Sequence, residues 1–199
     1  MAFNPGNSFA VHNDYYTPFY AWDNLSKILV KHKKRKSDGN PKPKLRVWEP
    51  FMLNSNGQSK QYLEQLGFEV LGDTQHDFFD LSTRPDPSEY DIAISNPPFE
   101  RVRSFRNRHK NLKYRCIQGL LDIGKPFVII INSLNVCSRW FAELIRSHEQ
   151  HIRFIYPTKK INFDKYKQGG QEKIHVESNS ASFLSIYMCY KVLENNEWI

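Results

Sequence analysis

Four consecutive residues, Asn96, Pro97, Pro98 and Phe99, combine groups that could hold a flat amine and expose its lone pair. The Asn96 side chain offers a carbonyl acceptor, and the two prolines stiffen the backbone and remove its donors, so a main-chain carbonyl can face the amine. Phe99 adds a π-face for stacking on a base. Two acceptors aimed at an exocyclic NH2 group would draw the nitrogen lone pair out of conjugation, and that step needs no general base. Asn-Pro is also a common turn dipeptide, so its place in the fold matters.

The tetrapeptide follows a short apolar segment, "YDIAIS" at 90–95, that is typical of a buried strand. Two other polar loops stand in the same relation to a strand. "EPF" follows "LRVW" at 45–48, and "GDTQHDFF" begins at the last residue of "FEVLG" at 68–72. Ligands of open α/β sheets bind at the carboxyl ends of the strands. We therefore expect the three loops to converge on one site.

The elements around these loops alternate between strand and helix, which is the signature of βαβ units with right-handed crossovers. The chain's last long apolar segment follows the strand at 152–157 without an intervening helix, so these two strands should pair antiparallel. The predicted fold class is an open Rossmann-like sheet, α/β and mostly parallel, with an antiparallel C-terminal hairpin. Helices are expected over 17–32, 60–68, 112–124 and 136–148, further strands over 125–132 and 180–193, and a charged loop over 31–44.

The charge balance favours a polyanionic partner. Lys and Arg total 28 against 21 Asp and Glu, a formal net charge of +7, and such an excess favours nucleic acid through counterion release. The tetrapeptide is followed at once by a dense basic run that could hold the phosphates beside an extruded base. A solvated loop and helix start is the alternative interpretation. The basic residues proposed for phosphate contact are Arg101, Arg103, Arg106, Arg108 and Lys110, and the run continues through Lys113 and Arg115.

Cysteine usage and hydropathy narrow the class of protein further. The three cysteines, Cys116, Cys137 and Cys189, are far apart and lack the paired spacing of a zinc site, so no metal site is expected. No segment reaches the roughly 18 to 20 apolar residues of a membrane span. We expect residues 1–199 to form a single domain without a separate target-recognition domain. The expected location is the cytoplasm, or the nucleus in a eukaryotic host.

With these motifs the chain resembles the S-adenosylmethionine-dependent adenine-N6 DNA methyltransferases, particularly the small phage-type and restriction-associated members. The resemblance extends over about residues 13 to 190. It implies transfer of a methyl group from S-adenosylmethionine to the exocyclic N6 of adenine in DNA, with the base flipped into the pocket formed by Asn96 to Phe99. It also implies cofactor contacts from a "YTP"-like motif, an "EPF" loop and a "DFF"-like motif. The matching residues are Tyr16, Thr17, Pro18, Glu49, Pro50, Phe51, Asn56, Gly57, Asp77 and Phe78; Asp73, just past its strand, is placed to accept hydrogen bonds from ribose hydroxyls.

The sequence departs from the family pattern in two places. Leu53 and Ser55 stand where family members usually have glycines, two and four residues after the phenylalanine of "EPF". Only 16 residues separate Gly72 from Glu89, so the usual helix and third strand must be shortened or absent. Two alternatives remain open: a methyltransferase acting on RNA adenine or on protein glutamine, and a degenerate nucleic-acid-binding subunit of the same fold that has lost its cofactor.

Overall fold

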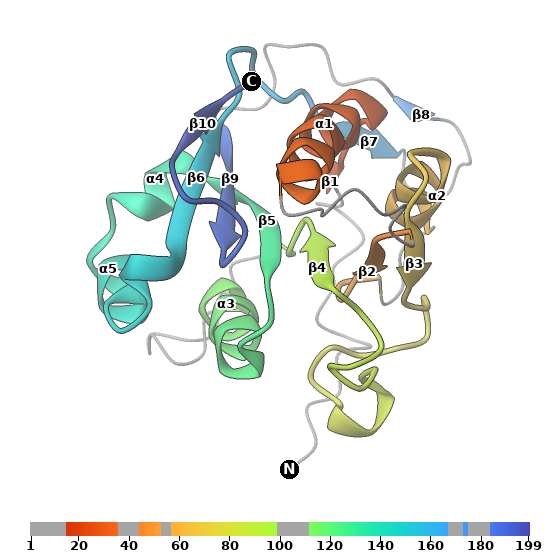
Figure 1. Ribbon diagram of the computed structural model, residues 1–199, viewed down its shortest axis with the longest axis horizontal. Helices are drawn as coiled ribbons and strands as arrows, with labels where there is room; N and C mark the ends of the chain where they lie inside the picture. The colour runs from red at the N-terminus through yellow and green to blue at the C-terminus, as the bar shows by residue number, and fades with distance from the viewer. Residues whose placement is uncertain (1–14, 36–43, 53–56, 99–111, 167–172, 175–183) are drawn as a thin grey trace.

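A central sheet of seven strands organises the computed structural model, which describes residues 15–35, 44–52, 57–98, 112–166, 173–174 and 184–199 (Figure 1). The strand order is β10-β6-β9-β5-β4-β2-β3. Neighbouring strands from β3 to β5 are parallel, whereas β9 is antiparallel to both β5 and β6. The predicted fold class is confirmed. The strands are β2 (Arg46–Trp48), β3 (Glu69–Leu71), β4 (Ile92–Ser95), β5 (Phe127–Asn132), β6 (Ile152–Tyr156), β9 (Ser185–Tyr190) and β10 (Glu197–Trp198).

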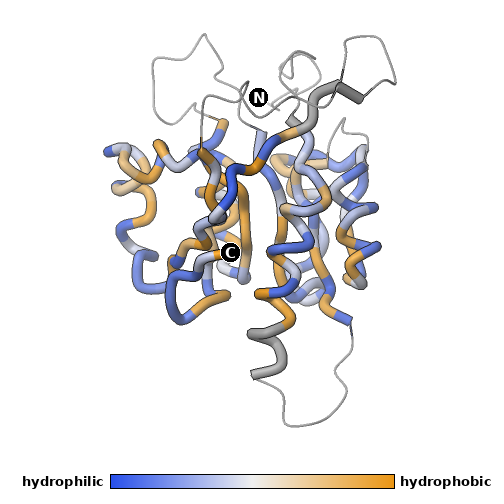
Figure 2. The backbone as a smooth tube through the Cα atoms, turned by 90° about the horizontal axis from the view of Figure 1, so that it is seen from above, coloured by the Kyte–Doolittle hydropathy of each residue, from blue (hydrophilic) through white to orange (hydrophobic). Residues whose placement is uncertain are grey.

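Helices cover both faces of this sheet, so the central strands β4, β5 and β9 are mostly apolar. Ile92 and Ile94 of β4 belong to the core cluster that contains α1 (Phe19–Arg35) and α2 (Gln58–Gln65). Ala93 belongs to the opposite cluster, with α3 (Leu112–Ile123) and α5 (Arg139–Ile145). A short helix, α4 (Ser133–Val136), joins β5 to α5. Figure 2 shows hydrophobic segments running through the middle of the molecule.

Gly67 ends α2 and lets the chain reverse direction. Gly67 has φ 90, and its N–H donates to the Glu64 carbonyl at 2.9 Å. The N–H of Phe68 donates to the Leu63 carbonyl at 3.2 Å. This pair of bonds is the Schellman arrangement, which satisfies the last carbonyls of a helix and needs a left-handed residue. The chain therefore turns sharply from α2 into β3.

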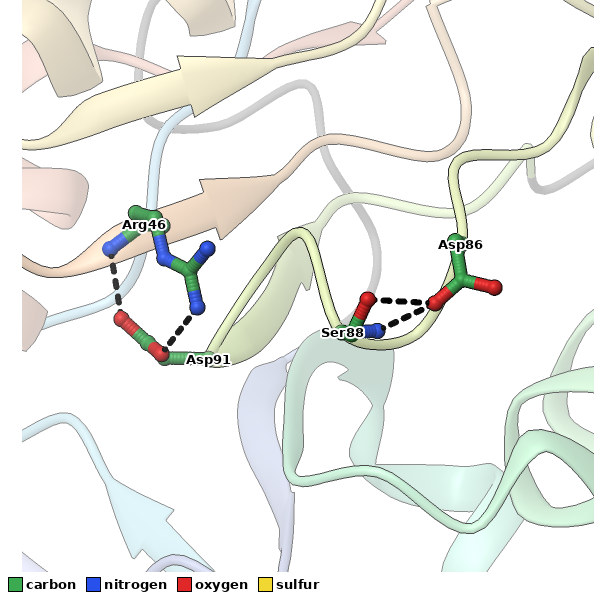
Figure 3. A network of polar contacts seen from close by, with 4 residues as sticks. All are labelled: Arg46, Asp86, Ser88 and Asp91. Atoms are coloured by element: carbon green, nitrogen blue, oxygen red, sulfur yellow. Dashed lines mark hydrogen bonds and ion pairs between the residues drawn. The ribbon is translucent and has the colours of Figure 1, made fainter.

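The link between β3 and β4 is short, as the sequence predicted. All residues from 72 to 91 are described, and they contain only a 3-10 turn, η2 (Leu81–Thr83), and no strand. Hydrogen bonds inside the link and at its end hold it in place (Figure 3). Asp86 Oδ1 accepts from the N–H of Ser88 at 2.8 Å and from its hydroxyl at 2.6 Å. Asp91 accepts from Arg46 at both the amide, 2.9 Å, and the guanidinium, 3.1 Å, which fixes the start of β4 beside β2.

One predicted loop is partly wrong. The charged stretch 31–44 was expected to be a loop, but α1 continues through Arg35. Lys and Arg favour helices intrinsically, and the glycine and prolines that would break one come only later, at 39–43. Residues 36–43 lie outside the described part of the chain.

A second, three-stranded sheet lies beside the first: β1 (Tyr15–Tyr16), β7 (Asp164–Tyr166) and β8 (Lys173–Ile174). β1 and β7 pair antiparallel, as do β7 and β8. None of the described helices is both long enough and apolar enough to span a membrane.

Candidate functional site

The three predicted loops begin at the carboxyl ends of β2, β3 and β4. The "EPF" loop after β2 and the "GDTQHDFF" loop after β3 lie beside the first residues of the loop after β4. The three strands are parallel neighbours and end at Trp48, Leu71 and Ser95. The N–H of Glu49 donates to the Leu71 carbonyl at 2.9 Å, and the Ser95 hydroxyl donates to Glu49 Oε1. The residue that begins the "EPF" loop is thus bonded to the last residues of both neighbouring strands. The convergence expected from the sequence is present at this edge of the sheet.

Glu49 is a buried carboxyl at the centre of this arrangement. It is 5% exposed, and its Oε1 accepts from the Ser95 hydroxyl and from the N–H of Phe51 at 3.2 Å. Burial raises the pKa of Glu49 from 4.5 to about 7, although both hydrogen bonds act in the opposite direction. A carboxylate that is shielded from water and oriented by two donors is suited to binding a ligand ammonium group.

Gly72 allows the loop after β3 to approach the loop after β2. It has φ +131, and a Cβ built there would lie 2.7 Å from the Glu49 carbonyl oxygen and 3.1 Å from Met52 Sδ. The ammonium of Lys60 in α2 donates to the Gly72 carbonyl at 3.1 Å. Only glycine fits this position, because any side chain would collide with the main chain of the "EPF" loop. The contact keeps both loops close to the Glu49 carboxyl.

Other cofactor residues predicted in these loops are Pro50, Asn56, Gly57 and Asp73, and those that the structure describes differ in burial and position. Gly57, at φ 69, precedes the first turn of α2, whereas Asn56 lies outside the described residues. Asp73 is exposed, and its Oδ1 accepts from the N–H of Gln75 at 2.8 Å. Pro50 is buried beside Glu49.

The "EPF" and "DFF" motifs meet through their aromatic rings. The ring centroids of Phe51 and Phe78 are 4.7 Å apart, and Phe78 is also 5.9 Å from Trp48. Phe78 is only 4% exposed and belongs to the core cluster. Asp77 Oδ1 accepts from the N–H of Phe79 at 2.9 Å, which holds the turn that presents these rings. The motif therefore has a packing role in this structure, beside the "EPF" loop.

The "YTP"-like segment lies next to α2. Tyr16 pairs with Asp164 in the small sheet, and Pro18 is buried. Thr17 is 2% exposed, and its hydroxyl has no hydrogen-bond partner among the described residues. The ring of Phe19, the first residue of α1, packs edge-on against Tyr62 of α2 at 5.4 Å. Buried hydroxyls are nearly always satisfied, so Thr17 Oγ1 is available to a polar ligand.

The catalytic candidates follow Ser95 directly. Asn96 is half-buried with its Oδ1 enclosed, Pro97 is buried, and Pro98 is half-buried. Phe99 and the basic residues Arg101, Arg103, Arg106, Arg108 and Lys110 lie outside the described part of the chain. Beyond them, the guanidinium of Arg115 in α3 lies 4.2 Å over the Phe79 ring. One charge of the basic run is thus packed against the "DFF" loop.

A solved structure shares this arrangement of sheet and helices. It comes from Listeria monocytogenes and is described as a candidate class I S-adenosylmethionine-dependent methyltransferase. The match covers 89% of this chain and 61% of that one, with a TM-score of 0.55 and 14% sequence identity. The chain has a Rossmann-like methyltransferase fold. No family model and no curated protein matches the sequence.

Two residues of the site were missed by sequence reasoning. The sequence marks Ser95 as the end of a strand and Gly72 as the first residue of the loop "GDTQHDFF", and it assigns neither residue a role of its own in the site. The signal for Ser95 was a hydroxyl closing the otherwise apolar segment "IAIS". Within the described ranges, no cluster of three or more His, Cys, Asp or Glu side chains could hold a metal ion.

Proposed function

We propose that this protein transfers a methyl group from S-adenosylmethionine to the exocyclic N6 of adenine in DNA. The observation that carries the proposal is the position of Asn96 and Pro97 at the carboxyl end of β4, directly after Ser95, whose hydroxyl donates to the buried Glu49. In open α/β sheets this edge is where cofactor and substrate meet. The fold shared with a candidate class I methyltransferase supports the same assignment.

The residues around Glu49 fit the methionine part of S-adenosylmethionine. Glu49 would accept from the ammonium group, and the Thr17 hydroxyl, which has no partner among the described residues, would be satisfied by a polar group of the cofactor. Gly72 keeps its loop close enough for both neighbouring main chains to line the cofactor. Asp73, exposed just past β3, would accept from ribose hydroxyls. When bound, the cofactor supplies an electrophilic methyl group on a sulfonium.

The catalytic residues hold the acceptor nitrogen. Asn96 Oδ1 and the Pro97 carbonyl would each accept a hydrogen bond from the adenine NH2, which turns the nitrogen lone pair toward the methyl donor. Pro97 and Pro98 carry no N–H, so no main-chain donor from these residues competes for the site. Phe99 would stack on the base. Glu49 is engaged by Ser95 and Phe51 and is not needed as a base, because the nitrogen loses its proton only after methylation.

DNA is the proposed polymer because the motifs of the chain resemble those of the adenine-N6 DNA methyltransferases, and in a duplex the target base would have to be extruded to reach this edge. The basic run that follows Phe99 would hold the phosphates on either side of the extruded nucleotide. Arg115, at the end of that run, already lies beside the "DFF" loop.

Replacement of Asn96 by alanine tests the mechanism. Asn96→Ala should abolish methyl transfer while leaving the calorimetric affinity for S-adenosylmethionine within about twofold, because Asn96 contacts the base and not the cofactor. Asn195→Ala is the matched control. Asn195 is an exposed asparagine in the segment after β9, and β9 ends at the edge of the sheet opposite the proposed site. Retained turnover in Asn96→Ala would refute the assigned role.

A further inference from the structure

Ser95 is a buried hydroxyl in a strand that is otherwise apolar. It is 1% exposed, closes β4, and lies opposite Ile129 of β5 in the sheet. Its Oγ donates to Glu49 Oε1, 46 residues away in the sequence. The next residue in the chain is Asn96. Ser95 therefore touches the proposed cofactor carboxylate and is covalently joined to the proposed catalytic residue.

Apart from Ser95, few groups around Glu49 donate a hydrogen bond to its carboxylate or carry a charge that would stabilise it. The loop that carries Glu49 contributes the Phe51 N–H, and β3 contributes only the Leu71 carbonyl, which accepts from the Glu49 amide. Lys60 of α2 donates to the Gly72 carbonyl. No ion pair joins Glu49 to a Lys, Arg or His of the described residues, and its pKa carries no contribution from a neighbouring charge. Ser95 is thus the one side-chain donor that the described structure gives to this carboxylate.

We propose that Ser95 is a positioning residue that orients the Glu49 carboxylate for the cofactor ammonium and fixes the main chain leading into Asn96. The inference rests on the proposed function and adds a residue to it. One hydroxyl would then connect the cofactor half of the site with the substrate half.

The bond has a consequence that packing alone would not produce. The Ser95 hydroxyl lowers the pKa of Glu49 against the effect of burial. Its removal should raise that pKa further, so the carboxylate needed for an ammonium ligand would form only at higher pH. Cofactor affinity in Ser95→Ala should therefore fall most near and below neutral pH and recover partly in alkali. A serine that only filled space would change stability without moving this pH dependence.

The test compares Ser95→Ala with Ser185→Ala by calorimetric titration with S-adenosylmethionine between about pH 6 and about pH 9. Ser185 is also a buried serine of the central sheet, 5% exposed, and its hydroxyl has no partner among the described residues. Loss of a hydrogen bond to a charged group predicts roughly tenfold or greater weakening at pH 7 in Ser95→Ala. The acid limb of its binding curve should move to higher pH. Ser185→Ala should match the unaltered chain in both respects.

A double-mutant cycle identifies Glu49 as the partner through which Ser95 acts. In a Glu49→Gln background the side chain no longer titrates, so adding Ser95→Ala should leave the pH dependence unchanged. The proposal would be overturned if Ser95→Ala shifted the pH dependence of cofactor binding equally in the unaltered chain and in Glu49→Gln. If Ser95→Ala does not fold, Ser95→Cys keeps a buried side chain with a weaker donor, and a smaller shift in the same direction is expected.

A direct titration of Glu49 separates this inference from the proposed function. The carboxyl carbon of Glu49 can be followed by carbon-13 NMR in the cofactor-free protein, where Ser95→Ala should raise its midpoint and Ser185→Ala should not. An unmoved midpoint overturns the inference even if the enzyme is active. A raised midpoint in a chain that binds no S-adenosylmethionine at any pH retains the Ser95–Glu49 link but refutes the proposed function and, with it, the role in cofactor binding.

Discussion

Replacing Glu49 by glutamine should stabilise the folded chain above neutral pH while it weakens cofactor binding. The pKa of Glu49 lies at about 7 in the folded chain, against an ordinary value of 4.5. The folded state therefore holds the Glu49 proton more tightly than the unfolded state does. Stability is fully present below about pH 4.5 and is lost as the pH rises through about 7. At about 1.4 kcal/mol for each pH unit, the whole difference amounts to about 3.5 kcal/mol.

Glutamine keeps the oxygen that accepts from Ser95 and Phe51 but carries no charge to bury, so Glu49→Gln should lack this pH-dependent cost. Urea unfolding followed by tryptophan fluorescence, at about pH 5 and about pH 8.5, measures the difference. The unaltered chain should lose about 2 to 3 kcal/mol more than Glu49→Gln between the two conditions. Cofactor affinity should fall at the same time, because the ammonium loses its charged partner. Parallel pH dependence of unfolding in the two proteins would refute the burial argument for Glu49.

Two glycines give further predictions. Gly72→Ala should unfold more easily and bind cofactor poorly, because its Cβ would lie 2.7 Å from the Glu49 carbonyl oxygen. Gly67→Ala is the control for backbone strain, since Gly67 also has a positive φ but has open space around it. Equal cofactor affinities in the two variants would contradict the prediction. Gly119→Ala gains about 1 kcal/mol of helix propensity but places Cβ 2.8 Å from the Phe78 ring, an overpacking worth about 1 to 3 kcal/mol. Thermal unfolding should show a net loss of stability, and a rise in the melting temperature would show that the ring moves freely.

Most of the fold could be predicted because short apolar runs alternate with helical segments along the chain. β5 is buried over five consecutive residues, and its short run of Val and Ile is typical of an interior strand. The antiparallel position of β9 followed from the missing helix after β6. The two-residue strand β10 was not predicted, because Glu197 and Trp198 are too few to show any periodicity. The extension of α1 to Arg35 was missed because the charge pattern of 31–35 suggested a loop.

The site was predictable as a set of loops but not in its contacts. The order of strands placed Glu49, Asp73 and Asn96 at one edge without any knowledge of side-chain positions. The bond between Ser95 and Glu49 depends on the register of β2 and β4, and a sequence carries no direct record of register. Phe78 illustrates the same limit. The "DFF" motif is compatible with a cofactor contact by Phe78 and with a core position for its ring. The structure places Phe78 in the core against Phe51.

The central claim is methyl transfer to adenine N6 in DNA, and isotope transfer tests it most directly. The purified protein would be incubated with deuterated-methyl S-adenosylmethionine and, separately, duplex DNA, single-stranded DNA and RNA, with Asn96→Ala and Asn195→Ala alongside. Nucleoside mass spectrometry should find labelled N6-methyldeoxyadenosine with the unaltered chain and Asn195→Ala, and none with Asn96→Ala. Label in RNA alone would contradict the assigned polymer, and absence of label from every nucleic acid would contradict the proposed function.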